Sequence, residues 1–322
     1  MRRCLCCYGE LESGLYHKAC SMKLFGSQEP PTIDYTLDEL YSKARDKIIE
    51  SAAVPGVQPK MSMERLSKAG DNKLTFVGLW GDYILKPQSK TYPFLPENEA
   101  LTMKLAEAAG IPTAPSGLLP LASGELAYLT LRMDRAGIKR YEAKKKLRHM
   151  EDFCQITEHM TEYKYKGSME LIAKNLRRYS TAPGYDLSVL FDMAVFIFLT
   201  GNGDMHLKNF SLLYDGGERR LAPAYDLLST RLVITEKDDP EEFAMPMNGK
   251  KSNFKEVDFI KFSESEGLNK NHYNRTMVRF AKRLPAMFSL IKQSFLPESA
   301  RRQYLELLES QAARLNILPD RV

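Results

Sequence analysis

Two short runs of this sequence carry side chains that could perform phosphoryl transfer. Residues 201–209 read Gly-Asn-Gly-Asp-Met-His-Leu-Lys-Asn, so that Asn209 follows Asp204 by five positions, and residues 224–226 read Ala-Tyr-Asp. Phosphoryl transfer needs an acid that accepts the proton of a hydroxyl, and oxygen ligands that hold Mg²⁺. We therefore predict Asp204 as the catalytic acid–base, and Asn209 and Asp226 as magnesium ligands. Because such a spacing also occurs by chance, the prediction depends on its context.

A second group of candidates precedes these runs. The loop from 56 to 60 could hold phosphates with backbone N–H groups and a lysine ammonium, although taken in isolation a plain turn would explain it better. Lys86 ends a strand-like segment and Glu99 lies thirteen positions later, so we predict that Lys86 binds ATP phosphates while Glu99 fixes its ammonium. Two unrelated surface charges are the alternative. The candidates in the loop are Gly56, Val57, Gln58 and Lys60.

The elements that must position these residues can be read from apolar spacing. Strand-like alternation predicts strands at 74–79 and 82–86 around a turn at Trp80-Gly81. We expect a helix that has Glu99 in its early part and runs to Ala109, stopped by Gly110 and Pro112. The remaining predictions are a core helix over 187–199 capped by Asp186 or Ser188, a hairpin turned by Gly216-Gly217, and helices over 258–265, 272–288 and 297–315, the second of which Pro285 kinks or ends early.

Five motifs of the chain resemble the HipA family of bacterial toxin kinases. They are Gly-Asn-Gly-Asp-Met-His-Leu-Lys-Asn-Phe-Ser (201–211), Pro-Ala-Tyr-Asp-Leu (223–227), Gly-Val-Gln-Pro-Lys (56–60), Asn98-Glu99 and Glu-Asp-Phe-Cys-Gln (151–155). The resemblance runs from about Pro55 to the C-terminus and implies an α+β, two-lobed fold related to protein kinases. We expect a small mixed lobe with antiparallel strands over 36–132 and a larger, mainly helical lobe over 136–322 that contains the catalytic loop.

The same resemblance implies an ATP- and Mg²⁺-dependent serine/threonine protein kinase. It makes Asp204 the catalytic acid–base, and it places the adenine-binding hinge at 130–133, with Leu131 and Met133 as contacts. His206 and Lys208 belong to the catalytic-loop motif and complete the candidate nucleotide contacts. Reported targets of the family are aminoacyl-tRNA synthetases, and a helix-turn-helix antitoxin commonly neutralises these kinases. We therefore expect a protein substrate of that kind and such an antitoxin as partners.

The chain departs from the family pattern at two points. Full-length HipA toxins carry a further N-terminal domain, whereas about 50 residues precede the phosphate loop here. It thus resembles the short, kinase-core form of three-component toxin systems, in which a small separate protein supplies the missing domain. Second, Ala53 stands where family members often carry a serine whose autophosphorylation silences the enzyme. Ser51 and Ser62 flank the loop and could replace it, or be ordinary loop serines.

Composition agrees with a cytoplasmic enzyme. The chain has 322 residues, 43% of them hydrophobic, which is ample for a large core. A net charge of +5 suits an acidic protein partner or nearby tRNA but is far from a nucleic-acid-binding signature. No signal peptide is evident, and the apolar run 187–199 is interrupted by Asp192 and too short to span a bilayer, so we expect no membrane association.

Four of the five cysteines lie within residues 1–29. Cys4 and Cys7 form one chelating pair, and His17 and Cys20 form a second, which together predict a tetrahedral structural zinc site resembling a zinc knuckle. Two alternatives stay open, because Cys6 could replace a neighbour as ligand and a segment this short could be disordered.

Two other functions share these sequence features. A small-molecule kinase acting on aminoglycosides or lipids would use the same Asp204, Asn209 and Asp226. A partner-binding module with a decayed kinase core is the second, but such decay usually removes at least one catalytic residue. The sequence does not identify the substrate, the antitoxin or the oligomeric state.

Overall fold

The computed structural model describes residues 2–43, 58–68, 71–77, 81–135 and 147–318. They belong to two compact units, each of which combines helices with antiparallel strands, so the predicted α+β class is confirmed. The first unit comprises Met1–Ala100, Ala114–Leu147 and Ser294–Leu296, and the second comprises Leu101–Thr113, Arg148–Gln293 and Pro297–Val322.

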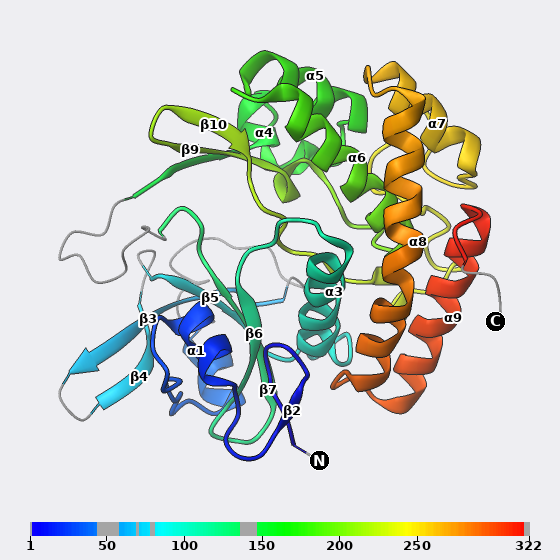
Figure 1. The fold of residues 1–322 in the computed structure, drawn as a ribbon. Helices are drawn as coiled ribbons and strands as arrows, with labels where there is room; N and C mark the ends of the chain where they lie inside the picture. Colours follow the sequence, from blue (N-terminus) through cyan, green and yellow to red (C-terminus); the bar gives the residue numbers. More distant parts are fainter. Residues whose placement is uncertain (1, 44–57, 69–70, 78–80, 136–146, 319–322) are drawn as a thin grey trace. The chain divides into compact units, whose positions relative to one another are not determined.

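The first unit is built around an antiparallel sheet with the strand order β4-β3-β5-β7-β6 (Figure 1). Strands were predicted at β4 and β5, and both are present. They do not pair with each other, however, because β3, which we did not predict, lies between them and pairs with both. The strands are β3 (Met61–Lys68), β4 (Asp71–Phe76), β5 (Tyr83–Lys86), β6 (Ser116–Pro120) and β7 (Leu126–Leu131).

Gly81 allows the segment just before β5 to pass very close to β3. A Cβ atom at this position would lie 2.4 Å from the backbone oxygen of Met63, so a side chain would force the two segments apart. The N–H of Gly81 donates to Oγ of Ser62 at 2.9 Å, which fixes the approach. Ser62 is therefore a strand residue that holds its neighbour, rather than a loop serine.

The predicted helix with Glu99 in its early part is confirmed as α3 (Leu95–Ala109). It ends where predicted, since Gly110 has a φ of +85°, a left-handed conformation that favours glycine. Asn98 and Glu99 in its first part are buried. Polar side chains rarely lie in such surroundings without a specific role or partner.

The N-terminal cysteine segment is part of the first unit. Its elements are short, and they pack on the sheet: the backbone oxygen of Leu5 accepts the N–H of Leu118 in β6 at 2.9 Å, and the Tyr16 hydroxyl donates to the oxygen of Leu118 at 2.5 Å. Tyr83 in β5 donates its hydroxyl to the oxygen of Leu24. The elements are β1 (Arg2–Arg3), β2 (Glu10–Leu11) and α1 (Lys18–Phe25).

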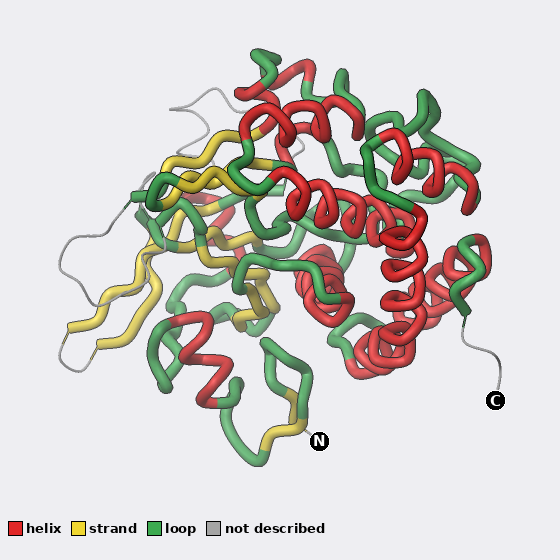
Figure 2. The backbone as a smooth tube through the Cα atoms, turned by 45° about the horizontal axis from the view of Figure 1, so that its top comes forward, coloured by secondary structure: helices red, strands yellow, loops and turns green. Residues whose placement is uncertain are grey.

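The second unit is mainly helical, as the red segments of Figure 2 show. It carries a three-stranded sheet in the order β10-β9-β8. The predicted hairpin is confirmed, since Gly216 and Gly217 both have positive φ angles between β9 and β10. The strands are β8 (His149–Asp152), β9 (Ser211–Asp215) and β10 (Glu218–Leu221). The helices are α4 (Phe153–Ile156), α5 (Met169–Tyr179), α6 (Pro183–Thr200), α7 (Glu256–Ser265), α8 (Lys270–Gln293) and α9 (Glu298–Arg314), with the 3₁₀ turns η1 (Thr161–Tyr163), η2 (Leu207–Asn209) and η3 (Thr230–Leu232).

The core helix α6 is confirmed, but its predicted start is wrong. It begins at Pro183, whose missing N–H and fixed φ suit a first helical position. Asp186 is not a cap: its buried carboxylate accepts from Oγ of Ser180 at 2.5 Å and from the N–H of Leu221 at 3.0 Å. By length and composition α6 could cross a membrane, but 78% of it is buried inside the structure, as in a core helix.

Two further details of the helical unit concern a proline within a helix and a buried charge. Pro285 does not end α8, which continues to Gln293 and lies beside α9 (Figures 1 and 2). Asp192, which interrupts the apolar run of α6, forms an ion pair with Arg279 of α8 and accepts from the Thr276 hydroxyl at 3.3 Å. Its buried charge is thus compensated by a neighbouring helix.

Candidate active site and candidate metal centre

The loop that carries Asp204 begins where α6 ends. Gly201 has a φ of +59°, and a Cβ there would lie 2.8 Å from Cγ of Arg231, so this turn requires glycine. The hydroxyl of Thr230 accepts the N–H of Gly203 at 2.8 Å and donates to the oxygen of Gly201 at 3.0 Å. These two bonds hold the loop on both sides of the turn, immediately before Asp204.

The spacing of five between Asp204 and Asn209 reflects the 3₁₀ turn η2. Oδ1 of Asn209 accepts the backbone N–H of His206 at 3.2 Å, which orients the amide. An amide oxygen has two lone pairs, so one remains for a cation. Asn209 is buried and Asp204 is half-buried, as expected for a metal ligand and for a base that a substrate must reach.

Asp226 is brought to this loop by its neighbour Tyr225. The Tyr225 hydroxyl donates to the oxygen of Lys208 at 2.9 Å and bonds Oγ of Ser211 at 2.6 Å, so it spans the two sides of Asn209. Asp226 itself has a φ of +56°, an uncommon conformation for a residue with a side chain that often marks functional sites. An amide oxygen and a carboxylate on adjoining segments form a donor set that suits Mg²⁺.

The Asp204 carboxylate has a partner that the sequence did not indicate. The Tyr165 hydroxyl donates to Oδ1 of Asp204 at 2.7 Å, and the Tyr165 ring meets the His206 ring edge-on at 5.1 Å. Burial raises the pKa of the Tyr165 phenol, and its bond to Asp204 raises it further. The phenol is therefore a proton donor at neutral pH. No sequence signal distinguishes Tyr165 from the nearby Tyr163.

His206 and Lys208 have structural contacts within the same loop. His206 is buried, and its backbone N–H takes part in the turn around Asn209. Nζ of Lys208 lies 2.7 Å from Oδ2 of Asp152, which also caps α4 by accepting the N–H of Gln155. Their predicted contacts with the nucleotide stay predictions.

Lys86 and Glu99 form a buried ion pair in the first unit, as predicted. Their Nζ and Oε1 atoms lie 2.6 Å apart, with side-chain exposures of 4% and 3%. Nε2 of Gln58 donates to the oxygen of Pro87 at 2.7 Å, which brings the end of the predicted phosphate loop beside Lys86. Lys60 is exposed. The other predicted residues of this loop lie outside the described residues: Gly56, Val57, Ala53 and Ser51.

The predicted hinge begins at the end of β7. Leu131 is buried and its N–H donates to the oxygen of Pro115 at 2.9 Å, while the N–H of Arg132 donates to the oxygen of Asp82 at 2.8 Å. Met133 follows in a half-buried turn. Because the N–H groups of Leu131 and Arg132 are already used, an adenine contact through a backbone donor would fall to Met133 or beyond.

The N-terminal cluster is assembled in the first unit. The ligand atoms of Cys4, Cys7, His17 and Cys20 all lie within 4.8 Å of one another. Cys6, the alternative ligand, donates its thiol to the oxygen of Ser116 at 3.4 Å. The structure thus brings together the four residues that the spacing favoured, and metal binding by them stays a prediction.

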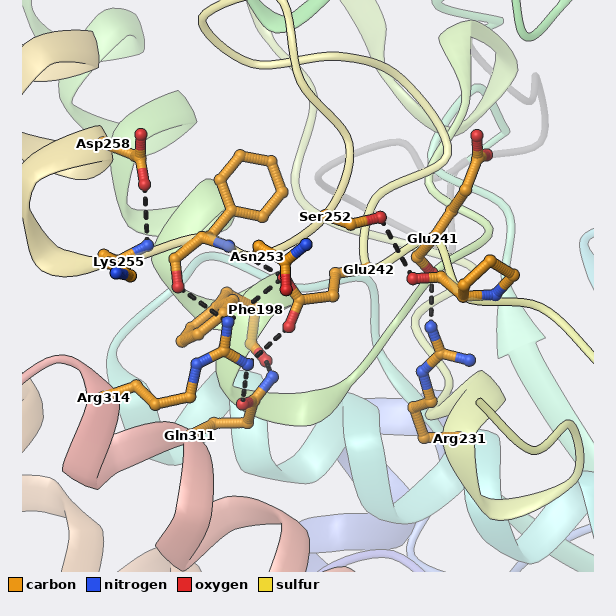
Figure 3. Close-up of polar contacts among 12 residues, drawn as sticks. Phe198, Arg231, Glu241, Glu242, Ser252, Asn253, Lys255, Asp258, Gln311 and Arg314 are labelled. Atoms are coloured by element: carbon orange, nitrogen blue, oxygen red, sulfur yellow. Dashed lines mark hydrogen bonds and ion pairs between the residues drawn. The ribbon is translucent and has the colours of Figure 1, made fainter. Parts of the chain in front are cut away.

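A groove of about 930 Å³ lies elsewhere in the second unit, and none of the site residues predicted from the sequence lines it. Arg314 at its wall pairs with Glu242 at 2.5 Å and donates to the oxygen of Phe254 at 2.7 Å, and Arg231 donates to the oxygen of Glu241 (Figure 3). The acidic segment around 238–242 is therefore partly held by arginines.

Comparison with known proteins gives consistent matches. The model of the HipA-like C-terminal domain matches residues 52–288. A putative kinase of Haemophilus influenzae is 27% identical over 295 residues, which are 84% of this chain and 83% of that protein. The putative kinase Y4mE of Sinorhizobium fredii is 36% identical over 183 residues, 55% of this chain and 42% of the relative. The serine/threonine-protein kinase toxin HipA of Shewanella oneidensis is 27% identical over 252 residues, 72% of this chain and 55% of the toxin. The chain thus spans about half the length of the last two relatives.

Two solved structures resemble the fold. A chain in the complex of HipA, HipB and operator DNA from Shewanella oneidensis superposes with a TM-score of 0.71 at 23% identity, covering 90% of this chain and 73% of that one. The proinflammatory kinase CtkA of Helicobacter pylori gives a TM-score of 0.53 at 15% identity, covering 80% and 94%. At these identities the likeness concerns the fold, and the predicted kinase-like fold is confirmed.

Proposed function

Because the chain belongs to the family defined by the HipA-like C-terminal domain, we propose that it is an ATP- and Mg²⁺-dependent serine/threonine protein kinase. The observation that supports this proposal is that Asp204 and Asn209 share one loop, to whose flanking residues Lys208 and Ser211 the neighbour of Asp226, Tyr225, is hydrogen-bonded. The buried ion pair of Lys86 with Glu99 adds the phosphate-binding lysine. Both sets of residues are parts that phosphoryl transfer requires.

Each residue has a distinct role in this proposal. Asp204 accepts the proton of the acceptor hydroxyl, and Asn209 and Asp226 supply oxygen ligands for Mg²⁺. When bound, Mg²⁺ neutralises charge on the phosphates. Glu99 holds the Lys86 ammonium in place so that it is available to phosphate oxygens without reorganisation. Gln58, anchored on Pro87, holds the end of the phosphate loop beside that lysine.

We further propose that the kinase acts in the cytoplasm as the toxin of a toxin–antitoxin system. The support is the relative named as a serine/threonine-protein kinase toxin and the structural neighbour in complex with HipB and operator DNA. A translation factor such as an aminoacyl-tRNA synthetase is the proposed substrate, and a helix-turn-helix antitoxin is the proposed partner. A small separate protein that supplies the N-terminal domain of longer relatives is a second proposed partner.

A phosphotransfer screen tests the substrate class. The purified protein with labelled ATP and Mg²⁺ is offered a panel of aminoacyl-tRNA synthetases and, separately, aminoglycosides and inositol lipids. We expect label on a serine or threonine of one synthetase, and none with the Asp204→Ala variant. Transfer to a small alcohol but to no protein would instead support the small-molecule kinase.

A further inference from the structure

We propose that Cys4, Cys7, His17 and Cys20 bind one structural Zn²⁺, which fastens the N-terminal segment (residues 2–25) to the edge strand β6. A tetrahedral zinc ion with Zn–S bonds of about 2.3 Å places its ligand atoms roughly 3.5–3.8 Å apart. The four ligand atoms lie within 4.8 Å of one another, so small side-chain adjustments complete the site. Four protein ligands close the coordination shell, and this indicates a structural ion.

Hydrogen bonds around the cluster prepare the histidine as a ligand. Nε2 of His17 lies 2.9 Å from the backbone oxygen of Glu10, and because a carbonyl can only accept, Nε2 must carry the proton. Nδ1 then carries a lone pair, which accepts a hydrogen bond from the Cys7 thiol at 3.2 Å and could bind a metal in its place. Zinc-binding histidines typically donate their second ring nitrogen to a carbonyl or carboxylate in this way.

The segment needs such an ion because it has little regular structure of its own. Its two strands have two residues each and its helix has eight, lengths that are not stable in isolation. It nevertheless supplies the Leu5 oxygen and the Tyr16 hydroxyl to Leu118 of β6. β6 is an edge strand of the sheet, and covering an edge prevents unwanted pairing with another chain.

Metal content and hydrogen exchange test this site without reference to activity. Freshly reduced protein, prepared without chelator, should hold about one equivalent of zinc, and the Cys7→Ser/Cys20→Ser variant should hold none. Cys6→Ser and Cys154→Ser are matched controls that should keep the metal. If the double variant fails to fold, Co²⁺ added to chelator-treated wild-type protein should still give the visible bands of tetrahedral thiolate coordination.

Removing zinc should also raise amide exchange in β6 while leaving the β9–β10 hairpin of the other unit unchanged. Zinc-free wild-type protein, or one equivalent retained by Cys7→Ser/Cys20→Ser, would overturn the metal site. Unchanged exchange at Leu118 on zinc removal would overturn its role at the sheet edge.

A second inference concerns the catalytic base, and it rests on the proposed kinase function. The geometry points to Tyr165 as a positioning residue that orients the Asp204 carboxylate through the 2.7 Å bond to Oδ1. Among the described residues, no second side chain donates a hydrogen bond to that carboxylate. With Oδ1 held, the carboxylate cannot rotate freely, and Oδ2 remains for the acceptor hydroxyl. Bonds from a hydroxyl to a carboxylate are among the stronger hydrogen bonds in proteins.

Tyr165 is held firmly enough to do this. The oxygen of its neighbour Lys164 accepts the N–H of Leu207 at 3.1 Å, which ties the segment to the catalytic loop. The Lys164 ammonium lies 4.9 Å from the centre of the Tyr165 ring. Two residues later, a Cβ at Gly167 would lie 2.6 Å from the Leu207 side chain, so backbone and loop are in close contact.

Removing one oxygen atom tests this role. Tyr165→Phe should lower kcat about tenfold, a part of the 10²–10⁴-fold that general base catalysis typically contributes, and leave KM for ATP unchanged. Tyr163→Phe is the matched control, because Tyr163 lies in the same segment with similar exposure (44% against 43%) and should behave as wild type. In an Asp204→Asn background, Tyr165→Phe should cause no further loss, since the two residues act as one unit.

The possible results separate the two proposals. A Tyr165→Phe enzyme as active as Tyr163→Phe would overturn the positioning role alone. A Tyr165→Phe enzyme faster than wild type would also overturn the positioning role, and would show that the Tyr165 phenol occupies the place of the acceptor hydroxyl. A wild-type protein no more active than Asp204→Asn would overturn the proposed kinase function, and the role of Tyr165 with it.

Discussion

Asp204→Asn is expected to slow phosphoryl transfer by about 10²–10⁴-fold while leaving nucleotide binding intact. The amide keeps the size and hydrogen-bonding oxygen of the carboxylate, so it can still accept the Tyr165 hydroxyl, but it cannot take the proton of an acceptor. Single-turnover transfer from labelled ATP measures the first effect, and calorimetric titration with Mg·ATP measures the second.

Two further variants make this assignment specific. Asp226→Ala should weaken Mg·ATP binding as well as transfer, because it removes a proposed metal ligand. Asp238→Asn is the matched control for the loss of a carboxylate, since Asp238 is exposed and bonds the hydroxyl of Thr235. Normal turnover by Asp204→Asn would show that another residue is the base.

Lys86→Met is expected to reduce the free energy of unfolding by about 3–5 kcal/mol and to abolish ATP binding. The loss of stability arises because the variant leaves the carboxylate of Glu99, which is 3% exposed, without its ammonium partner in the protein interior. Urea-induced unfolding measures the stability, and equilibrium titration with Mg·ATP measures binding.

The Lys86→Met/Glu99→Leu variant should recover much of that stability, since it replaces a buried ion pair by apolar side chains, yet it should still not bind ATP. Lys73→Met is the matched control in the same sheet. Its ion pair with Asp34 has side-chain exposures of 45% and 61%, and such pairs contribute at most about 1 kcal/mol. If Lys86→Met were as mild as Lys73→Met, the buried pair would not have the structural role assigned to it.

The sequence alone determined those parts of the site whose residues are close together in the chain. The spacing of Asp204 and Asn209 predicts a tight turn, and η2 provides it. The helix that carries Glu99 and the hairpin at Gly216-Gly217 also depend on local apolar periodicity and on backbone conformations that favour glycine. The grouping of the paired cysteines and histidine was predictable for the same reason, because chelating positions recur at short intervals.

Only the tertiary structure decided which distant residues meet. Tyr165 lies 39 positions before Asp204, and nothing in the local pattern distinguishes it from Tyr163. Asp192 was visible as a break in an apolar run, but its partner Arg279 lies on another helix. Strand β3 went unpredicted because its alternating buried residues Met61 and Met63 are not typical strand formers.

The physical reason is the same in each of these cases. A turn or a helix is stabilised by hydrogen bonds between neighbours in the chain, so the types and spacing of its own residues predict it. A buried charge or phenol is tolerated wherever folding supplies a partner, and many pairings of distant residues would satisfy the same side chain. Cys6 illustrates the difference: its position in the sequence allowed it to be a ligand, and only the fold places its thiol against the oxygen of Ser116, 110 residues away.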